Sequence, residues 1–189
     1  MATAQQAFLS RIEGQFWRVS TKDIIGSVLM GIALNLVQQV TERADAALTG
    51  GSFIIFGSIS YMTIFTIAAI YFRYPGALIT GLVQAGISVA TAASPMSPAF
   101  VWTNIIQSFA AVLIVWRLSL RPWWHWPVLT FGHGLVGSIC IAIGLWLILQ
   151  LPANVILLSA SVTWVIESAV SAPLVAVIAR GIDRSGVLD

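Results

Sequence analysis

Two apolar runs separated by a short basic turn decide the fold of this chain: FIIFGSISYMTIFTIAAIYF at 53–72, then Arg73-Tyr74-Pro75, then GALITGLVQAGISVATAA at 76–93. Neither run contains a charged residue. Each is close to the roughly 20 residues that a helix needs to cross the hydrocarbon core of a bilayer. Because Pro75 is a turn former, the sequence predicts two membrane-spanning helices that are joined at this basic turn.

The rest of the chain repeats this pattern of apolar runs and short turns. The predicted spans are 24–40, 53–72, 76–93, 99–116, 127–149 and 155–179. The first span is the least regular, because Asn35, Gln38 and Gln39 interrupt its second half. We therefore expect an all-α membrane protein, a single domain built as a bundle of six transmembrane helices over residues 1–189.

The composition agrees with a protein whose main solvent is lipid. Of the 189 residues, 58% are hydrophobic and 8% are charged, and the mean hydropathy is +0.92. Soluble domains carry about 25% charged residues. The pI of about 9.1 does not indicate nucleic-acid binding, because the basic residues lie between the apolar runs and not on a continuous face.

The basic residues also predict how the chain is oriented in the membrane. Cytoplasmic segments of membrane proteins are enriched in Lys and Arg. With the N-terminus inside, Arg43 alone lies outside, whereas the inner segments hold eight basic residues: Arg11, Arg18, Lys22, Arg73, Arg117, Arg121, Arg180 and Arg184. We expect a multi-pass protein of the cell inner membrane with both termini in the cytoplasm.

The first 20 residues lack a continuous apolar core, so no cleavable signal peptide is evident. They place Phe8, Leu9, Ile12, Phe16 and Trp17 on roughly one side of a helix. This pattern predicts an amphipathic helix at the membrane surface, and an arm that binds a partner is the alternative.

Polar residues inside the spans are the candidate functional residues, since polar groups are costly in a bilayer. Glu167 is the only acidic residue at membrane depth, near the middle of the last span. It is expected either to contact a ligand or to be a protonated acid that hydrogen-bonds a neighbouring helix. The other candidates lie from mid-membrane outward: Tyr61, Gln84, Ser88, Trp102, Asn104, Gln107 and Trp164.

This mixture of amides, indoles and one carboxyl suits a small ligand, with aromatic faces to stack on and a few polar groups to orient it. Asn104 and Gln107 are three residues apart and share a helix face. The alternative is that these side chains only bond helices to one another.

Other features narrow the function further. His125 and His133 have no companion at metal-ligand spacing, and Cys140 is the single cysteine, so no metal site or cofactor is expected. The absence of a Gly-x-x-x-x-Gly-Lys-Ser/Thr motif excludes an ATPase. Near the inner end of the first span, small residues form a face that lets another helix approach closely, in this chain or in a partner: Gly26, Ser27 and Gly31.

Several motifs resemble a known family. They are Tyr71-Phe72-Arg73-Tyr74-Pro75-Gly76-Ala77, followed after 17 residues by Pro95-Met96-Ser97-Pro98, then Gln107, and the tail Ser185-Gly186-Val187-Leu188. The pattern resembles the S components of energy-coupling factor (ECF) vitamin transporters, closest to the group for thiamine and its hydroxymethylpyrimidine precursor. That likeness implies a ligand site under the outer loops, and as partners a transmembrane coupling protein and two cytoplasmic ATPases.

The resemblance also implies that a small-residue face on the first helix meets the coupling protein, a role open here to Gly26, Ser27 and Gly31. The group's pattern has glutamates at three places where this chain has none: the positions of Leu82 and Val89, and one position within 108–112. For a cationic ligand, Glu167 is expected to supply a replacement charge from the last helix; the alternative is a neutral aromatic ligand such as a pyrimidine.

The sequence therefore favours a non-enzymatic substrate-binding subunit of an ATP-driven importer for a small vitamin. An S component for a different vitamin and a structural or assembly subunit without a ligand remain alternatives. A membrane enzyme that uses Glu167 and His133 is disfavoured, because the two residues are predicted to lie at different depths.

Overall fold

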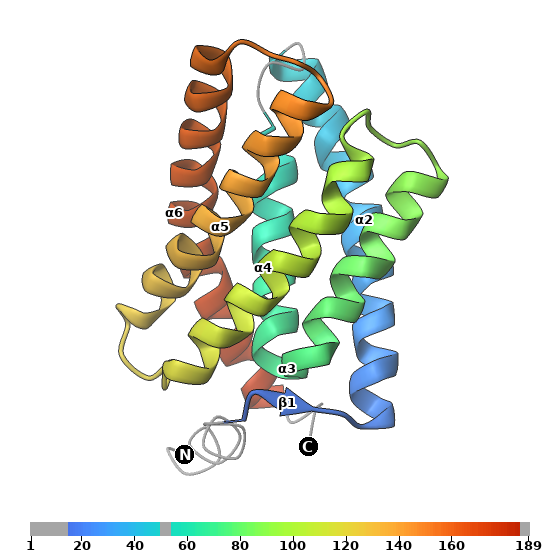
Figure 1. Ribbon diagram of the computed structural model, residues 1–189. Coiled ribbons are helices and arrows are strands. Elements are labelled where there is room, and N and C mark those ends of the chain that lie inside the picture. Colours follow the sequence, from blue (N-terminus) through green and yellow to red (C-terminus); the bar gives the residue numbers. More distant parts are fainter. Residues whose placement is uncertain (1–14, 50–53, 186–189) are drawn as a thin grey trace.

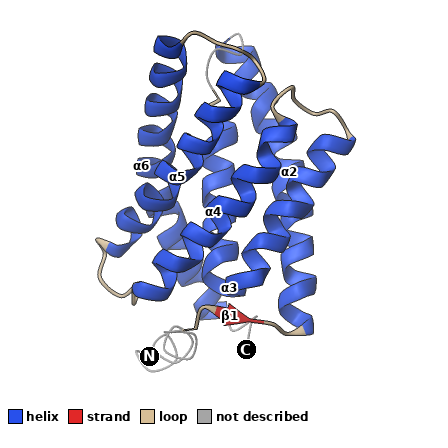
Figure 2. Ribbon diagram, in the orientation of Figure 1, coloured by secondary structure: helices blue, strands red, loops and turns tan. Residues whose placement is uncertain are grey.

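The computed structural model describes residues 15–49 and 54–185, and this part of the chain is almost entirely helical (Figures 1 and 2). Its elements in chain order are β1 (Trp17–Arg18), α2 (Thr21–Thr49), α3 (Phe56–Ala90), α4 (Ser97–Arg117), α5 (His125–Leu147) and α6 (Ala153–Ser185). The helix α2 continues without a break through the amides at 35, 38 and 39 and extends nine residues beyond the predicted span, to Thr49. The all-helical prediction is thus confirmed for the described residues.

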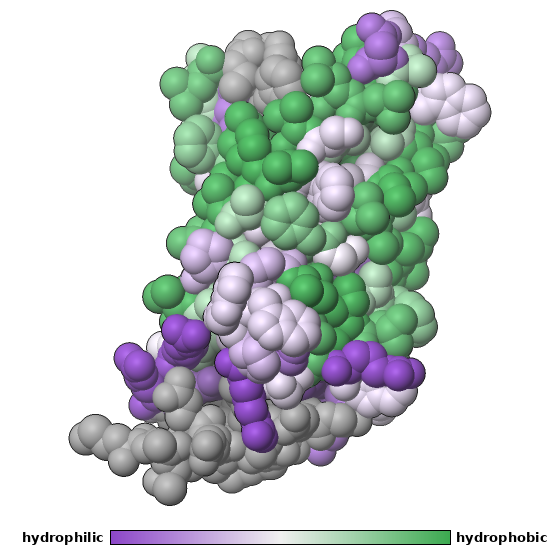
Figure 3. Space-filling view, turned by 90° about the vertical axis from the view of Figure 1, so that its left-hand side faces the viewer, coloured by the Kyte–Doolittle hydropathy of each residue, from purple (hydrophilic) through white to green (hydrophobic). Residues whose placement is uncertain are grey.

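Five helices in the described part of the chain, α2 to α6, are long and apolar enough to cross a membrane. Many large apolar side chains lie on the protein surface, among them Leu29, Leu36, Leu157 and Val177, each at least 60% exposed. On the face drawn in Figure 3, hydrophobic residues form a broad band between hydrophilic residues at the two ends. Such a surface is stable in lipid and not in water, so the fold is that of a multi-pass membrane protein.

The longest helix, α3, is broken at the basic turn. Arg73 has φ 53° and ψ −154°, and Tyr74 has φ −102° and ψ 131°, values that no α-helix contains. The chain reverses direction there. The distance between the two halves shows this, since a Cβ atom at Gly81 would lie 3.1 Å from Cε2 of Phe65. In one straight helix these two residues would be roughly 24 Å apart. Residues 56–72 and 75–90 are therefore two helical halves that lie side by side (Figure 1).

The connections alternate between the two ends of the bundle (Figure 1). We call the end with β1 and the Arg73 turn the basic end. All the Lys and Arg residues of the described chain lie there except Arg43, which lies in the last turns of α2 at the opposite end. The described chain also begins and finishes at the basic end: Trp17 pairs with Tyr74, and Asp183 accepts a hydrogen bond of 2.8 Å from the Tyr71 hydroxyl.

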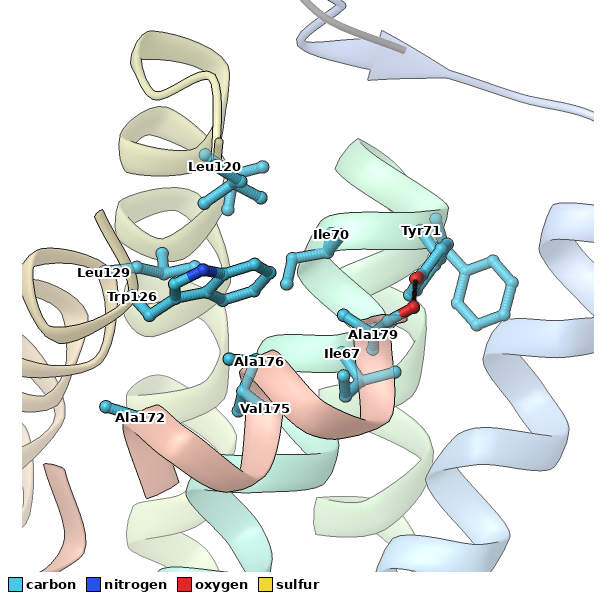
Figure 4. Close-up of a cluster of buried hydrophobic side chains, with 13 residues drawn as sticks. Ile67, Ile70, Tyr71, Leu120, Trp126, Leu129, Ala172, Val175, Ala176 and Ala179 are labelled. Carbon is cyan, nitrogen blue, oxygen red and sulfur yellow. Dashed lines mark hydrogen bonds between the residues drawn. The ribbon is translucent and has the colours of Figure 1, made fainter. Parts of the chain in front are cut away.

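The main apolar core lies towards the basic end, between the first half of α3 and helices α4 to α6 (Figure 4). Trp126 projects across it towards Ile70, and the Tyr71 hydroxyl donates a hydrogen bond of 2.8 Å to the Ala179 carbonyl. Trp126 is only 4% exposed, whereas Trp123 is 74% exposed. Trp126 is therefore a core residue, whereas Trp123 lies on the surface.

The described part of the N-terminal segment is extended and not helical, so the prediction of an amphipathic helix is wrong for Phe16 and Trp17. The strand β1 forms parallel bridges from Trp17 to Tyr74 and from Arg18 to Pro75. The Phe16 ring stacks on Tyr74 at 5.7 Å. Residues 1–14, which include Phe8, Leu9 and Ile12, lie outside the described residues.

Small residues on α2 pack against α3 of the same chain. A Cβ atom at Gly31 would lie 2.6 Å from the Thr80 carbonyl oxygen, and one at Gly26 would lie 2.7 Å from the Phe72 ring. Ser27 is fully buried, and its carbonyl accepts a 3.0 Å hydrogen bond from the Thr80 hydroxyl. The expectation that Gly26, Ser27 and Gly31 form a face for a coupling protein is therefore wrong, because α3 already covers that face.

Candidate functional site

Three polar side chains meet between the first half of α3 and α4. The Tyr61 hydroxyl lies 2.6 Å from the Asn104 Oδ1 atom and 3.0 Å from the Gln107 Oε1 atom. Asn104 and Gln107 occur one turn apart on α4, as their spacing predicted, and both are almost completely buried. Tyr61 is only partly buried. This contact is the centre of a larger set of hydrogen bonds.

From Asn104, hydrogen bonds continue into the second half of α3. The Asn104 amide nitrogen donates to the Gly81 carbonyl at 2.6 Å and to Gln84 Oε1 at 2.8 Å. The Gln84 nitrogen donates in turn to Gln38 Oε1 on α2 at 2.6 Å and to the Ser88 hydroxyl at 3.2 Å. Two amides in succession thus bond α4 to α3 and α3 to α2.

The same hydrogen bonds reach the outer part of α2. Asn35 donates to the Ser88 hydroxyl at 2.9 Å, and Gln39 donates to Asn35 Oδ1 at 3.0 Å. These amides looked in the sequence like a weakness in the first span. In the structure Asn35 and Gln38 bond α2 to α3, and Gln39 bonds Asn35 within α2.

On the other side, hydrogen bonds lead from Gln107 to α5. The Gln107 nitrogen lies 3.2 Å from His133 Nδ1, and the Thr66 hydroxyl lies 2.8 Å from His133 Nε2. Since Gln107 donates to Nδ1, the proton of the neutral imidazole is on Nε2 and points to the Thr66 oxygen. Thr66 donates its own hydrogen to the Met62 carbonyl.

These side chains form one connected set that joins α2, both halves of α3, α4 and α5. We call it the polar network; its members are Asn35, Gln38, Gln39, Tyr61, Thr66, Gln84, Ser88, Asn104, Gln107 and His133. All are buried except Gln39 and Tyr61, which are partly exposed. Hydrogen bonds between membrane helices contribute about 0.6 kcal/mol each on average, so the network also stabilises the packing of the bundle.

Two glycines make room for the amides. A Cβ atom at Gly137 on α5 would lie 2.6 Å from the Gln107 nitrogen, and one at Gly81 would lie 2.8 Å from Asn104 Cβ. At such distances the neighbouring amide would have to move. The helix backbones therefore approach closely just where the network needs it.

An open hollow of about 610 Å³ lies at the end of the bundle opposite β1, between the last turns of α2 and the connection from α3 to α4. Its lining includes Glu42, Arg43, Asp45, Ser94 and Pro95, and also Gln39 of the polar network. Asp45 also caps α3, accepting the Phe56 and Gly57 amide hydrogens at 2.9 and 2.7 Å. Gln39 thus connects the hollow with the polar network.

The structure brings together five of the eight predicted site residues, Tyr61, Gln84, Ser88, Asn104 and Gln107. The two tryptophans lie elsewhere and hydrogen-bond to carbonyls of α5. Trp102 donates to Cys140 at 3.4 Å, and Trp164 donates to Phe131 at 3.1 Å.

Glu167 is 7% exposed and lies on α6 where that helix packs against the outer part of α3. One turn further along α6, Ser171 donates to the Ile59 carbonyl at 3.2 Å. The Ser58 side chain is close to the Glu167 carboxyl, but its hydroxyl donates to the Ile54 and Ile55 carbonyls. Glu167 is near enough to Tyr61 for the two groups to interact electrostatically.

Sequence reasoning missed half of the polar network. Asn35, Gln38 and Gln39 were treated as a flaw in the first span, although their spacing of three and four residues places them on one helix face. Thr66 was not considered, because a threonine can satisfy its hydroxyl on its own helix. His133 was considered as a metal ligand and as part of a membrane enzyme, but not as a hydrogen-bond partner of Gln107. Within residues 15–49 and 54–185, no three His, Cys, Asp or Glu side chains lie close enough together to hold a metal ion.

The fold and the buried polar groups together define a multi-pass helical membrane protein with a hydrogen-bonded centre and a hollow at one end. Comparison of the chain with protein families, with curated proteins and with solved structures found no match.

Proposed function

We propose that this protein is the substrate-binding subunit of an ECF-type importer for a small vitamin. The observation that carries the proposal is the polar network, which lies beside the buried carboxyl of Glu167 and connects through Gln39 with the hollow. A ligand that enters from the hollow would meet amides, a phenol and a carboxyl. The sequence motifs favour thiamine or its hydroxymethylpyrimidine precursor as that ligand.

The proposed topology has six crossings with both termini in the cytoplasm of a cell with an inner membrane. It treats residues 56–72 and 75–90 as separate crossings, which the fold-back at Gly81 and Phe65 supports. The basic end would face the cytoplasm. Because Cys140 is the only cysteine, a Cys140→Ser protein with one new cysteine at Ser94 or at Ser119 tests this. An impermeant maleimide should label position 94 and not 119 in intact cells, and the reverse pattern would exclude the orientation.

A transmembrane coupling protein and two cytoplasmic ATPases are the proposed partners, since the chain contains no nucleotide-binding motif of its own. The coupling face is not the small-residue side of α2, which α3 covers. Purification of the tagged protein from its native membrane, under mild detergent, tests the partnership. Recovery of stoichiometric ATPase subunits supports the proposal, and recovery of the chain alone contradicts it.

The ligand is tested directly on the purified protein in detergent or nanodiscs. Thiamine or hydroxymethylpyrimidine at micromolar concentration should raise the unfolding temperature. For a cationic ligand, Glu167→Gln should weaken binding by roughly 1.5–3 kcal/mol, the contribution of a hydrogen bond to a charged group. A neutral ligand should lose less, and no effect on any ligand would mean that Glu167 serves only the packing of α6.

A second candidate function is a structural or assembly subunit without a ligand. It is favoured by the fact that the buried amides have partners within the bundle: Asn104 donates to Gln84, and Gln107 hydrogen-bonds Tyr61 and His133. In that case no vitamin would stabilise the protein, and Gln107→Met would change only the free energy of unfolding. The importer function predicts that the same variant also changes a dissociation constant.

A further inference from the structure

The centre of the polar network has too few hydrogens. Asn104 Oδ1 and Gln107 Oε1 both lie within hydrogen-bond distance of the Tyr61 oxygen, at 2.6 and 3.0 Å. A phenol carries one hydrogen, so Tyr61 can satisfy one of these two acceptors at a time. No other described side chain donates a hydrogen bond to either amide oxygen or to the Tyr61 oxygen. Three oxygen atoms thus surround a single hydrogen.

The described surroundings contain one carboxyl group and no Lys or Arg side chain. Glu167, 7% exposed, is close enough to Tyr61 to interact with it electrostatically. Among the described residues, the only Lys or Arg away from the basic end is Arg43, which lines the hollow. A buried acceptor that shares its donor is poorly satisfied, so a molecule that brings hydrogens here would be bound favourably.

Tyr61 is the partly exposed residue at this position. Of the polar network, only Tyr61 and Gln39 are not buried. Gln39 lines the hollow, whereas Tyr61 contacts the two buried amide oxygens. A ligand would therefore reach these acceptors beside the Tyr61 ring.

We infer that the site recognises its ligand through a hydrogen-bond-donating nitrogen, an amino or ammonium group, which donates to Asn104 Oδ1 and Gln107 Oε1 and lies on the side of Glu167. The inference rests on the proposed ligand-binding function and specifies the chemistry of recognition. An acceptor group, such as a carbonyl oxygen, would have only the Tyr61 hydrogen to bind. The site would therefore select an amino ligand over an oxo ligand of the same shape.

The His133 tautomer reports whether Gln107 is oriented as this selection requires. With its oxygen towards Tyr61, the Gln107 nitrogen donates to His133 Nδ1, and the imidazole proton is on Nε2. If the amide were reversed, its nitrogen would donate to Tyr61, and His133 would have to donate from Nδ1 to the amide oxygen. Nitrogen-15 NMR of histidine-labelled protein distinguishes the two tautomers.

The experiment compares two probes on the purified full-length protein in nanodiscs: hydroxymethylpyrimidine with its 4-amino group, and the compound in which an oxo group replaces that amine. We expect the amino probe to bind at least about tenfold more tightly, because the oxo probe leaves one acceptor unsatisfied and adds another. Equal binding, or tighter binding of the oxo probe, would overturn the inference while leaving the importer function in place. Binding of neither probe, nor of thiamine, would count against the proposed function itself.

Two variants sharpen the result. Tyr61→Phe removes the one hydrogen available to an oxo group, so the ratio of the two affinities should widen, whereas a narrower ratio would contradict the inference. Gly86→Ala is the control, because nothing lies within 4 Å of the added methyl group, and it should leave the ratio unchanged. Since both probes are measured on the same sample, the ratio is insensitive to partial unfolding. An Nδ1-protonated His133 in the complex with the amino probe would also overturn the inference.

Discussion

Asn104 on α4 donates a hydrogen bond of 2.8 Å to Gln84 on the second half of α3, and both side chains are at most 2% exposed. This amide pair connects the part of the polar network that holds α2 with the part that contains His133. In a low-dielectric interior such a pair is valuable when both members are satisfied and costly when one is missing.

Replacement of one member should therefore destabilise the bundle. Asn104→Leu leaves Gln84 Oε1 and the Gly81 carbonyl without this donor, and we expect a loss of about 1–3 kcal/mol in the free energy of unfolding. Denaturation in mixed micelles, followed by circular dichroism, measures it. Gln39→Leu is the matched amide control, because Gln39 is partly exposed to the hollow and can be replaced by water. A larger loss for Gln39→Leu than for Asn104→Leu would contradict this assignment of the network's core.

Glycine at position 137 should be required for the position of the Gln107 amide. In Gly137→Ala the new methyl carbon would lie 2.6 Å from the Gln107 nitrogen, so the amide must move away from His133. We expect destabilisation of about 1–3 kcal/mol from this overpacking, together with a changed His133 signal in nitrogen-15 NMR. Gly86→Ala, which meets nothing within 4 Å, should change the free energy of unfolding by less than about 1 kcal/mol. Similar effects of the two substitutions would mean that helix propensity, and not the amide, determines the result.

Gly31→Leu should separate α2 from α3. The added side chain would clash with the Thr80 carbonyl and with Val83, at 2.6 and 2.8 Å from the new Cβ atom. The Thr80 carbonyl belongs to the backbone and cannot move without displacing the helix. We therefore expect the free energy of unfolding to fall by more than about 2 kcal/mol. Disulfide trapping between cysteines introduced at Asn35 and Ser88, in a Cys140→Ser background, should fall in the variant. Unchanged trapping, with a loss only of partner binding, would restore the small-residue face as a coupling surface.

Asp45 should be needed for the start of α3 at the rim of the hollow. Its two carboxylate oxygens accept the Phe56 and Gly57 amide hydrogens, so Asp45→Ala should cost about 0.5–2 kcal/mol, as the loss of a helix cap does. Hydrogen exchange at Phe56 and Gly57 should become faster, while exchange in α5 stays the same. Glu42→Ala is the control on the same helix, and an equal effect at Phe56 would show that general charge and not the cap is responsible.

The sequence predicted the helical class and the break at Arg73, because long uncharged runs and a basic proline turn are strong local signals. It predicted five members of the polar network from their depth along the spans. It could not predict which face each helix presents, so Trp102 and Trp164 were grouped with amides that they do not contact. For the same reason it left open whether the small residues of α2 contact this chain or a partner, and only the family resemblance favoured a partner.

The polar face of α2 has a consequence for how the protein is made. Asn35 finds its partner in Ser88, a residue 53 positions later in the chain. Until the second half of α3 has been synthesised, Asn35 Nδ2 and Gln38 Oε1 lack their partners Ser88 and Gln84, and only the hydrogen bond from Gln39 to Asn35 can form within α2. The first helix therefore reaches its final place only after the chain has turned at Arg73 and the second half of α3 has entered the bilayer. Assembly of this bundle is completed inside the membrane, after insertion, and not helix by helix as the chain emerges.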